Sequence, residues 1–444
     1  MTSIRAAASR VAELLVGMSA SRLALWIAFV AVHVWLGLVN LLGPGLPLGD
    51  VTITYRFWTD QAFSHDYWVG IDSVWVYPIL AILPMLASFA FGPEVYGSTW
   101  LTLVMVLNGV AFAFLTRPTF SRERLAIAWW WIAFLLLLGP IALGRIDSVT
   151  IPLAVVGVVL LATRPRIAAF ILVIATWMKI WPAALLAAIV VSSKHRLATV
   201  VVALGTSAAI VLVMFALGGG GAVFSFITQQ AGRGLQIEAP VSTAWLWQAA
   251  AGANNAYVYY DQGILTFQVT GDGADVAADL MTPLLAVVAL AVAALGILAV
   301  RRGAAALDVL APLSLALVTA LIAFNKVGSP QFISWLAVPI ILGLGARLAG
   351  SSVPFRVPAV IVLVIAALTQ VLYPYLYVYL LGLNTVLLIV ITARNALYFV
   401  LLAWAIAELW QVGTRARVGE GGPLSDEPWP ETAWPFAPNQ RGMI

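Results

Sequence analysis

The sequence predicts an all-α protein that crosses a membrane in about 11 to 12 passes, with hairpins and loops on the outer side. Hydrophobic residues make up 62% of the 444 residues and charged residues only 9%, whereas soluble domains are about 25% charged. Apolar runs of about 20 residues, the length that crosses a hydrocarbon core, recur along the chain. The basic residues fall in the short connections between these runs, as the positive-inside rule describes.

The residue content also excludes several classes of protein. The chain has no cysteine, so disulfide and thiolate chemistry are excluded. His33, His65 and His195 are too few and too scattered to form a histidine metal site. No phosphate-binding loop, zinc signature, nucleophile elbow or dinucleotide fingerprint occurs. The net charge of +4 is explained by the connections between helices, so we expect no cofactor, no metal and no nucleic-acid partner.

The N-terminal part of the chain is predicted to stay on the cytoplasmic side. Residues 1–22 could form an amphipathic helix that lies on the inner membrane surface. The apolar run Leu23–Leu42 follows three arginines and precedes no small-residue cleavage site, so we expect an uncleaved first helix that runs from inside to outside. The next connection, residues 43–73, carries four aspartates and one arginine, which fits an outer loop.

Two apolar runs are predicted to be hairpins rather than single spans. The run Val74–Phe91 contains Pro78 and Pro84, and each proline removes a helical hydrogen bond. If this run enters the membrane and returns on the outer side, all later basic clusters fall on the inner side. The run Ile167–Val191 is long for one span and is broken at Pro182. If this run forms a hairpin of two arms, its tip lies near the outer side.

This assignment of membrane passes, called the threading below, divides the chain into a membrane domain and two cytoplasmic ends. Residues 23–411 form the membrane domain, whose larger outer loops are residues 43–73 and 218–278. Residues 412–444, a polar segment rich in proline, glycine and tryptophan, are predicted to be a disordered cytoplasmic tail.

The threading gathers several ionisable residues at the outer end, where a charge at or inside the membrane is costly and therefore a functional candidate. Asp50 follows the first helix directly. Its carboxylate could act as a general base, or it could be a helix N-cap or an ordinary loop acid. Arg145 and Asp147 flank Ile146 in a tight outer turn, and the simplest expectation is that they pair with each other.

Two lysines and one tryptophan complete the candidates that the residues themselves indicate. Lys179 lies between aromatic residues at the tip of the second hairpin, where it could bind phosphate or reach to the interface as an ordinary lysine. Lys326 precedes a Ser-Pro pair, a common helix start whose free N–H groups attract an anion, with capping alone as the alternative. Trp245 could stack on a sugar or be an interfacial aromatic residue.

Short motifs occur in a characteristic order and carry a family resemblance. The motifs are Asp50 to Tyr55, Tyr77-Pro78, Gly144-Arg-Ile-Asp147, Lys179-Ile-Trp-Pro182, Ser329-Pro-Gln-Phe-Ile-Ser-Trp335 and Arg394-Asn395. An Asp that opens the outer loop after the first helix resembles the GT-C superfamily of glycosyltransferases that use lipid-phosphosugars. The closer resemblance is to glycosyltransferase family 87, bacterial envelope mannosyltransferases that use polyprenyl-phosphate mannose. The resemblance covers about residues 23 to 411.

The resemblance implies a GT-C-like enzyme of the bacterial plasma membrane whose active site faces the outer, periplasmic side. Such an enzyme moves a mannosyl unit from a polyprenyl-phosphate donor to a hydroxyl of a glycolipid or glycan acceptor, surrounded by membrane lipid, in the synthesis of lipoglycan or envelope glycan. Asp50 would be the catalytic base, and the reaction would invert the anomeric centre to give an α-mannoside. The implied donor-phosphate contacts are Lys179, Lys326, Arg56 and Arg145, and the sugar or acceptor contacts are Tyr55, Tyr77, Asp147, Trp245, Ser329 and Gln331.

Two other functions share these features. A flippase or transporter of lipid-linked sugars would have the same passes and a basic pocket, although transporters often show internal repeats and none is evident here. A GT-C enzyme that uses polyprenyl-phosphate arabinose or glucose would differ from a mannosyltransferase only in the donor sugar.

Overall fold

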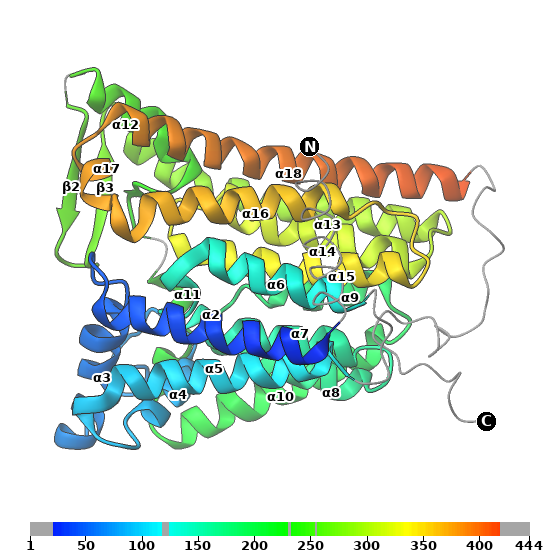
Figure 1. Ribbon diagram of the computed structural model, residues 1–444, viewed down its shortest axis with the longest axis horizontal. Coiled ribbons are helices and arrows are strands. Elements are labelled where there is room, and N and C mark those ends of the chain that lie inside the picture. Colours follow the sequence, from blue (N-terminus) through cyan, green and yellow to red (C-terminus); the bar gives the residue numbers. More distant parts are fainter. Residues whose placement is uncertain (1–20, 118–123, 230–231, 254, 418–444) are drawn as a thin grey trace, which may run out of the picture.

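The computed structural model describes residues 21–117, 124–229, 232–253 and 255–417 of the chain. Most of the amphipathic segment and most of the tail predicted from the sequence therefore lie outside the described residues. The helices run side by side along the long axis of the molecule (Figure 1). Within the described residues, nine helices are long and apolar enough to cross a membrane. The chain is therefore an all-α, multi-pass membrane protein, as predicted.

The described residues contain both long and short apolar helices. The long ones are α2 (Arg22–Leu42), α5 (Tyr96–Leu115), α6 (Leu125–Leu138), α10 (Arg196–Ala216), α13 (Ala274–Arg301), α14 (Ala306–Ala323), α15 (Ala337–Leu348), α16 (Arg356–Gln370) and α18 (Thr385–Arg417), where α6, α15 and α16 are each extended by an adjoining helical turn. The shorter apolar ones are α4 (Ile82–Ser88), α7 (Asp147–Leu160), α8 (Pro165–Thr176) and α9 (Ala183–Ser192). Nine of the described helices are thus long enough to span, and α7, α8 and α9 are apolar but shorter.

Both predicted hairpins occur. The segment around Pro84 forms η2 (Ile79–Ala81) and α4, which are too short to span, and the chain then enters α5 from the same end of the bundle (Figure 1). Helices α8 and α9 are joined by residues 177–182. Helix α8 has 12 residues and is about 18 Å long, well short of a hydrocarbon core of about 30 Å. If α8 starts at one membrane surface, the tip of this hairpin therefore lies below the other surface.

The basic helix ends gather at one end of the bundle. Helices α2, α10 and α16 begin with arginines, and α13 and α18 end with them. All of these ends lie on the right in Figure 1. The two predicted outer loops lie at the opposite end, together with α3, α12 and the β-sheet (Figure 1). This distribution is the one that the threading predicts.

The end of the bundle opposite the arginines is built from short elements rather than open loops. A π-helical turn, η1 (Asp50–Tyr55), continues into α3 (Arg56–His65). Strands β1 (Leu235–Gln236), β2 (Tyr257–Asp261) and β3 (Thr266–Thr270) form an antiparallel sheet in the order β1-β3-β2. This sheet packs with α12 (Thr243–Ala250) and α17 (Tyr377–Leu381) in a small apolar cluster. At the other end, α18 continues to Arg417, so the first six residues of the predicted tail are helical.

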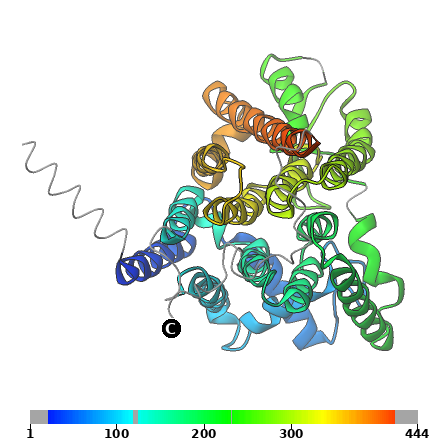
Figure 2. The same ribbon diagram turned by 90° about the vertical axis from the view of Figure 1, so that its right-hand side faces the viewer.

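Burial separates inner helices from membrane-facing ones. Almost every residue of α7 and α14 is buried, whereas α10 buries only Thr199 and Met214. The view along the bundle shows α10 at the rim (Figure 2). An apolar helix with exposed side chains is stable when its surroundings are lipid. Helix α7 is therefore a fixed inner support, and its first residue is one of the predicted site residues, Asp147.

Candidate functional site

The site is centred on the turn that begins α7. Gly144 allows this turn to lie against the loop after α2, because a Cβ atom there would come within 2.9 Å of the carbonyl oxygen of Pro47 and 3.1 Å of the side-chain oxygen of Asn40. The amide of Asn40 also donates to the carbonyl of Pro140. This close approach brings the beginning of α7 next to Asp50, which is distant in the sequence.

Asp50 is held by Arg145. The Nε atom of Arg145 lies 2.9 Å from Oδ2 of Asp50, and the two side chains are 8% and 44% exposed. Nη1 of Arg145 donates to the carbonyls of Pro47 and Gly144, and Nη2 donates to the hydroxyl of Tyr373 at 2.9 Å. Each guanidinium nitrogen thus has a partner. The carboxylate of Asp50 is fixed by one ion pair and is still accessible, which is what a base acting on an incoming hydroxyl requires.

Two sequence-based expectations about these residues are wrong. Arg145 and Asp147 do not pair with each other, because each one pairs with a different residue outside the turn. Asp50 is also not a helix N-cap, since it is the first residue of η1 and its cap position is occupied by Gly49.

Asp147 is buried and holds Lys179. Its side chain is 1% exposed, and its Oδ2 atom lies 3.8 Å from Nζ of Lys179. Its Oδ1 atom accepts a hydrogen bond of 2.6 Å from the indole N–H of Trp335. Oδ2 has no hydrogen-bond partner among the described residues. A buried carboxylate without compensation is strongly unfavourable, so the ammonium of Lys179 is its necessary counter-charge.

Aromatic rings complete the surroundings of Lys179. Its Nζ atom lies 4.7 Å from the centre of the Tyr77 ring and 5.6 Å from that of Phe332, within the range of cation–π attraction. The hydroxyl of Tyr77 is 3.3 Å from that of Tyr55, which accepts a hydrogen bond from the backbone N–H of Ile146. The structure thus brings together six predicted residues in one set of contacts: Asp50, Tyr55, Tyr77, Arg145, Asp147 and Lys179.

Other predicted residues lie outside this set. Arg56 is exposed on α3, and Trp245 packs in the apolar cluster below the sheet and donates to the carbonyl of Asp272. Ser329 precedes η8 (Pro330–Leu336) without a side-chain capping bond. Gln331, in η8, is buried.

Lys326 lies beside the sheet. Its carbonyl accepts a hydrogen bond from the backbone N–H of Gln236 in β1. Burial lowers the pKa of the Lys326 ammonium, and the nearby charge of Asp279 opposes this shift. The backbone hydrogen bond between Lys326 and Gln236 therefore joins the loop before η8 to the sheet.

A second buried ion pair was not predicted as part of the site. Nη1 of Arg394 lies 3.2 Å from Oε2 of Glu238, and Nη2 donates to the carbonyl of Glu238 at 2.7 Å. Asn395 accepts from Arg394 and donates to Thr243. Burial raises the pKa of Glu238, while Arg394 and a hydrogen bond from Tyr377 lower it. The signal in the sequence was a charged residue within the long apolar run of α18.

Replacing Arg394 with methionine is expected to destabilise the fold. Glu238 would be left as a buried carboxylate without its cation, a change that costs about 3–5 kcal/mol. The additional change Glu238→Gln removes the unpaired charge and should recover most of the loss. Thermal unfolding of the purified variants in detergent measures both effects. An Arg394→Met protein with wild-type Tm would show that the ion pair does not hold α18 to the loop.

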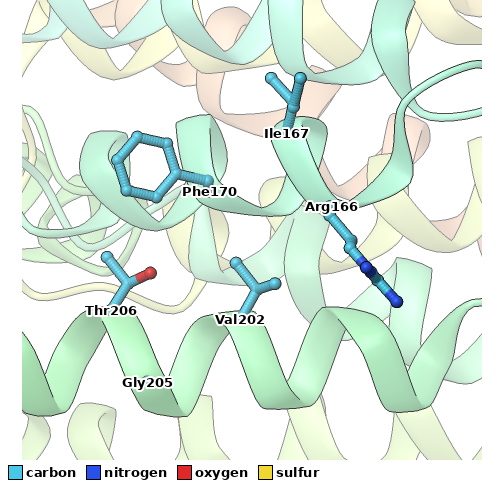
Figure 3. A pocket seen from close by; sticks show the side chains of 6 residues that line it. All are labelled: Arg166, Ile167, Phe170, Val202, Gly205 and Thr206. Carbon is cyan, nitrogen blue, oxygen red and sulfur yellow. The ribbon is translucent and has the colours of Figure 1, made fainter.

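A groove elsewhere in the molecule does not belong to this site. It has a volume of about 430 Å³ and lies between α8 and α10 (Figure 3). Its lining residues are Arg166, Ile167, Phe170, Val202, Gly205 and Thr206. These residues lie in the first half of α8 and between the start and the middle of α10, whereas Asp50 and Lys179 follow the last residues of α2 and α8.

The apolar helices and the two ion pairs Asp50–Arg145 and Asp147–Lys179 identify an integral membrane protein with a polar site among its helices. The family model for glycosyltransferase family 87 matches residues 75–324, more than half of the chain, and the chain belongs to this family. It is therefore a glycosyltransferase. No curated protein and no solved structure matches the chain. The matched segment includes Tyr77, Arg145, Asp147 and Lys179, whereas Asp50 precedes it.

Proposed function

We propose that this glycosyltransferase moves a mannosyl unit from a polyprenyl-phosphate donor to a hydroxyl of a glycolipid or glycan acceptor. The reaction takes place at the outer face of the bacterial plasma membrane and serves lipoglycan or envelope glycan synthesis. The observation that carries this proposal is the accessible carboxylate of Asp50, fixed by Arg145 in the same contact set as the ammonium of Lys179.

The proposed step is a single displacement. The oxygen of the acceptor hydroxyl bonds to the anomeric carbon of the donor, and Asp50 accepts the proton that this hydroxyl loses. The bond between that carbon and the donor phosphate oxygen breaks, and the electron pair leaves with the phosphate. Lys179 stabilises the charge on the departing phosphate. Attack from the face opposite the phosphate inverts the centre, so a β-linked donor gives an α-linked product.

The depth of Lys179 supports a lipid-linked donor. Helix α8 is about 18 Å long, so a chain that enters it at the cytoplasmic surface reaches Lys179 before it has crossed a core of about 30 Å. The hydrocarbon chain of a polyprenyl donor anchors its phosphate to the membrane, so the donor can enter a site that lies below the membrane surface from within the bilayer. A free nucleotide sugar has no such anchor and would remain in the aqueous phase.

The remaining assignments follow the same arrangement. Tyr55 and Tyr77 stand between the base and the cation and are proposed to contact the sugar. Ser329, Gln331 and Lys326 lie at the beginning of η8, whose Phe332 contacts Lys179, and are proposed to line the donor side. We propose that Arg56 contacts the part of the donor or acceptor that extends over α3, and that Trp245 contacts the part that extends over α12.

Transfer by the purified full-length protein tests the proposed function. The protein is reconstituted in nanodiscs with radiolabelled polyprenyl-phosphate mannose and mannosylated phospholipid or oligomannoside acceptors, and polyprenyl-phosphate arabinose and glucose are supplied in parallel. We expect a labelled product from the mannose donor. Transfer from only one of the other donors would replace mannose in the proposal. Movement of labelled lipid across vesicles without transfer would instead indicate a flippase.

Labelling of single cysteines tests the proposed orientation. The natural chain has no cysteine, so Ser64→Cys and Ser352→Cys each introduce one thiol at an exposed position near opposite ends of the bundle. In intact cells, a membrane-impermeant maleimide should label the Ser64→Cys protein fully and the Ser352→Cys protein only after the membrane is permeabilised. The reverse pattern would place the site on the cytoplasmic side.

A further inference from the structure

The turn at the start of α7 carries two opposite charges whose partners do not overlap. Arg145 binds Asp50, and Asp147, two residues later, binds Lys179. Asp50 comes from the segment after α2, and Lys179 comes from the α8–α9 hairpin. One rigid turn therefore connects the proposed base to the proposed phosphate-binding cation.

The surroundings of this turn restrict its movement. The hydroxyl of Ser148 donates to the carbonyls of Leu143 and Arg145. Asp147 is fixed by the indole of Trp335, which stacks on Trp181 with 5.9 Å between ring centres. The side chains of Asp147 and Arg145 are 1% and 8% exposed. Neither presents enough surface to bind a sugar or a lipid phosphate directly.

We propose that Arg145 and Asp147 are a pair of positioning residues that set the distance between the base and the leaving-group cation. Arg145 orients the carboxylate of Asp50, and Asp147 orients the ammonium of Lys179. This assignment rests on the proposed function. It replaces the direct contacts that the sequence suggested, with Arg145 on the donor phosphate and Asp147 on a sugar.

The two residues must then affect different kinetic parameters. Arg145 is the ion-pair partner that holds the carboxylate of Asp50, so removing it leaves this carboxylate without a fixed orientation toward the acceptor hydroxyl, and catalysis slows while the donor still binds. Loss of the Asp147 charge releases Lys179 from its fixed position, so the donor binds less well while Asp50 is unaffected.

The test compares Arg145→Gln and Asp147→Asn in the reconstituted full-length protein with polyprenyl-phosphate mannose as donor. We expect Arg145→Gln to lower kcat about tenfold, because a misplaced base reacts more slowly, with donor KM within about twofold of wild type. We expect Asp147→Asn, which keeps an oxygen for Trp335, to raise donor KM about tenfold and to leave kcat within about twofold of wild type.

Controls separate a positioning role from a merely structural one. Asp308→Asn and Arg347→Gln remove a carboxylate and a guanidinium that bond to the segment around Ser351, at the end of the bundle near Arg356, and should show neither signature. Size-exclusion chromatography checks that each variant is folded. If Arg145→Gln does not fold, Arg145→Lys retains the charge but not the guanidinium geometry, and it should lower kcat with donor KM unchanged.

Three results would overturn the inference. A raised donor KM in Arg145→Gln would show direct contact with the phosphate, and a raised acceptor KM in Asp147→Asn would show contact with the acceptor. Equal losses in both parameters for both variants would show a structural role alone. A wild-type protein that transfers no sugar refutes the proposed function instead, so the two failures can be told apart.

Discussion

Asp50→Asn is expected to lower kcat by about 10²- to 10⁴-fold, the contribution of a general base. Asparagine has nearly the same shape and can still accept a hydrogen bond from Arg145, but its amide cannot take the proton of the acceptor hydroxyl. The change leaves donor KM nearly unaltered because Asp50 pairs with Arg145 and is separate from the Lys179 pair. Initial rates at saturating donor and acceptor measure the effect.

Asp60→Asn is a matched control for this prediction. Asp60 is an acid of the same outer segment, and it accepts a hydrogen bond of 3.1 Å from the hydroxyl of Ser64. Its loss should leave kcat within about twofold of wild type, as is usual for a surface substitution away from the site. If folded Asp50→Asn protein retains wild-type turnover, Asp50 is not the base.

Lys179→Met is expected to lower kcat/KM by about 10²-fold or more, since removing one group that stabilises developing negative charge has this effect in other enzymes. The variant also leaves Asp147 buried without its cation, which destabilises the protein. The double variant Lys179→Met with Asp147→Asn removes both charges. It should regain stability without regaining activity, as seen in parallel thermal unfolding and transfer assays.

Lys194→Met removes a lysine that is exposed in the turn before α10 and serves as the control. It should retain wild-type activity. If the double variant at Lys179 and Asp147 transfers sugar at the wild-type rate, then Lys179 does not act on the leaving phosphate, and its role is confined to balancing the charge of Asp147.

The sequence predicted the membrane fold well because the physics of spanning is local. The length of an apolar run and the position of arginines decide where a pass begins and ends. Prolines at positions 84 and 182 marked the two segments that do not cross as single helices. The short sheet and α12 were missed because they lie in a polar segment without a periodic pattern long enough to be recognised.

The site was predicted only in part because its pairings are distant in the chain. Asp50, Arg145, Asp147 and Lys179 were each identified as costly charges at the outer end. Their partners were not, because Asp50 and Arg145 become neighbours only when the loop after α2 lies against the turn before α7. Glu238 was not identified as a candidate, since nothing in the local sequence indicates that it meets Arg394 of α18 in the folded protein.

The anomeric configuration of the product tests the central proposal most directly. Purified protein is supplied with polyprenyl-phosphate mannose of known β configuration, and the new linkage is assigned from its one-bond carbon–proton coupling in the NMR spectrum. A single displacement assisted by Asp50 predicts an α-linked mannose. A β-linked product would contradict the proposal, because retention requires a second displacement or a different attacking group.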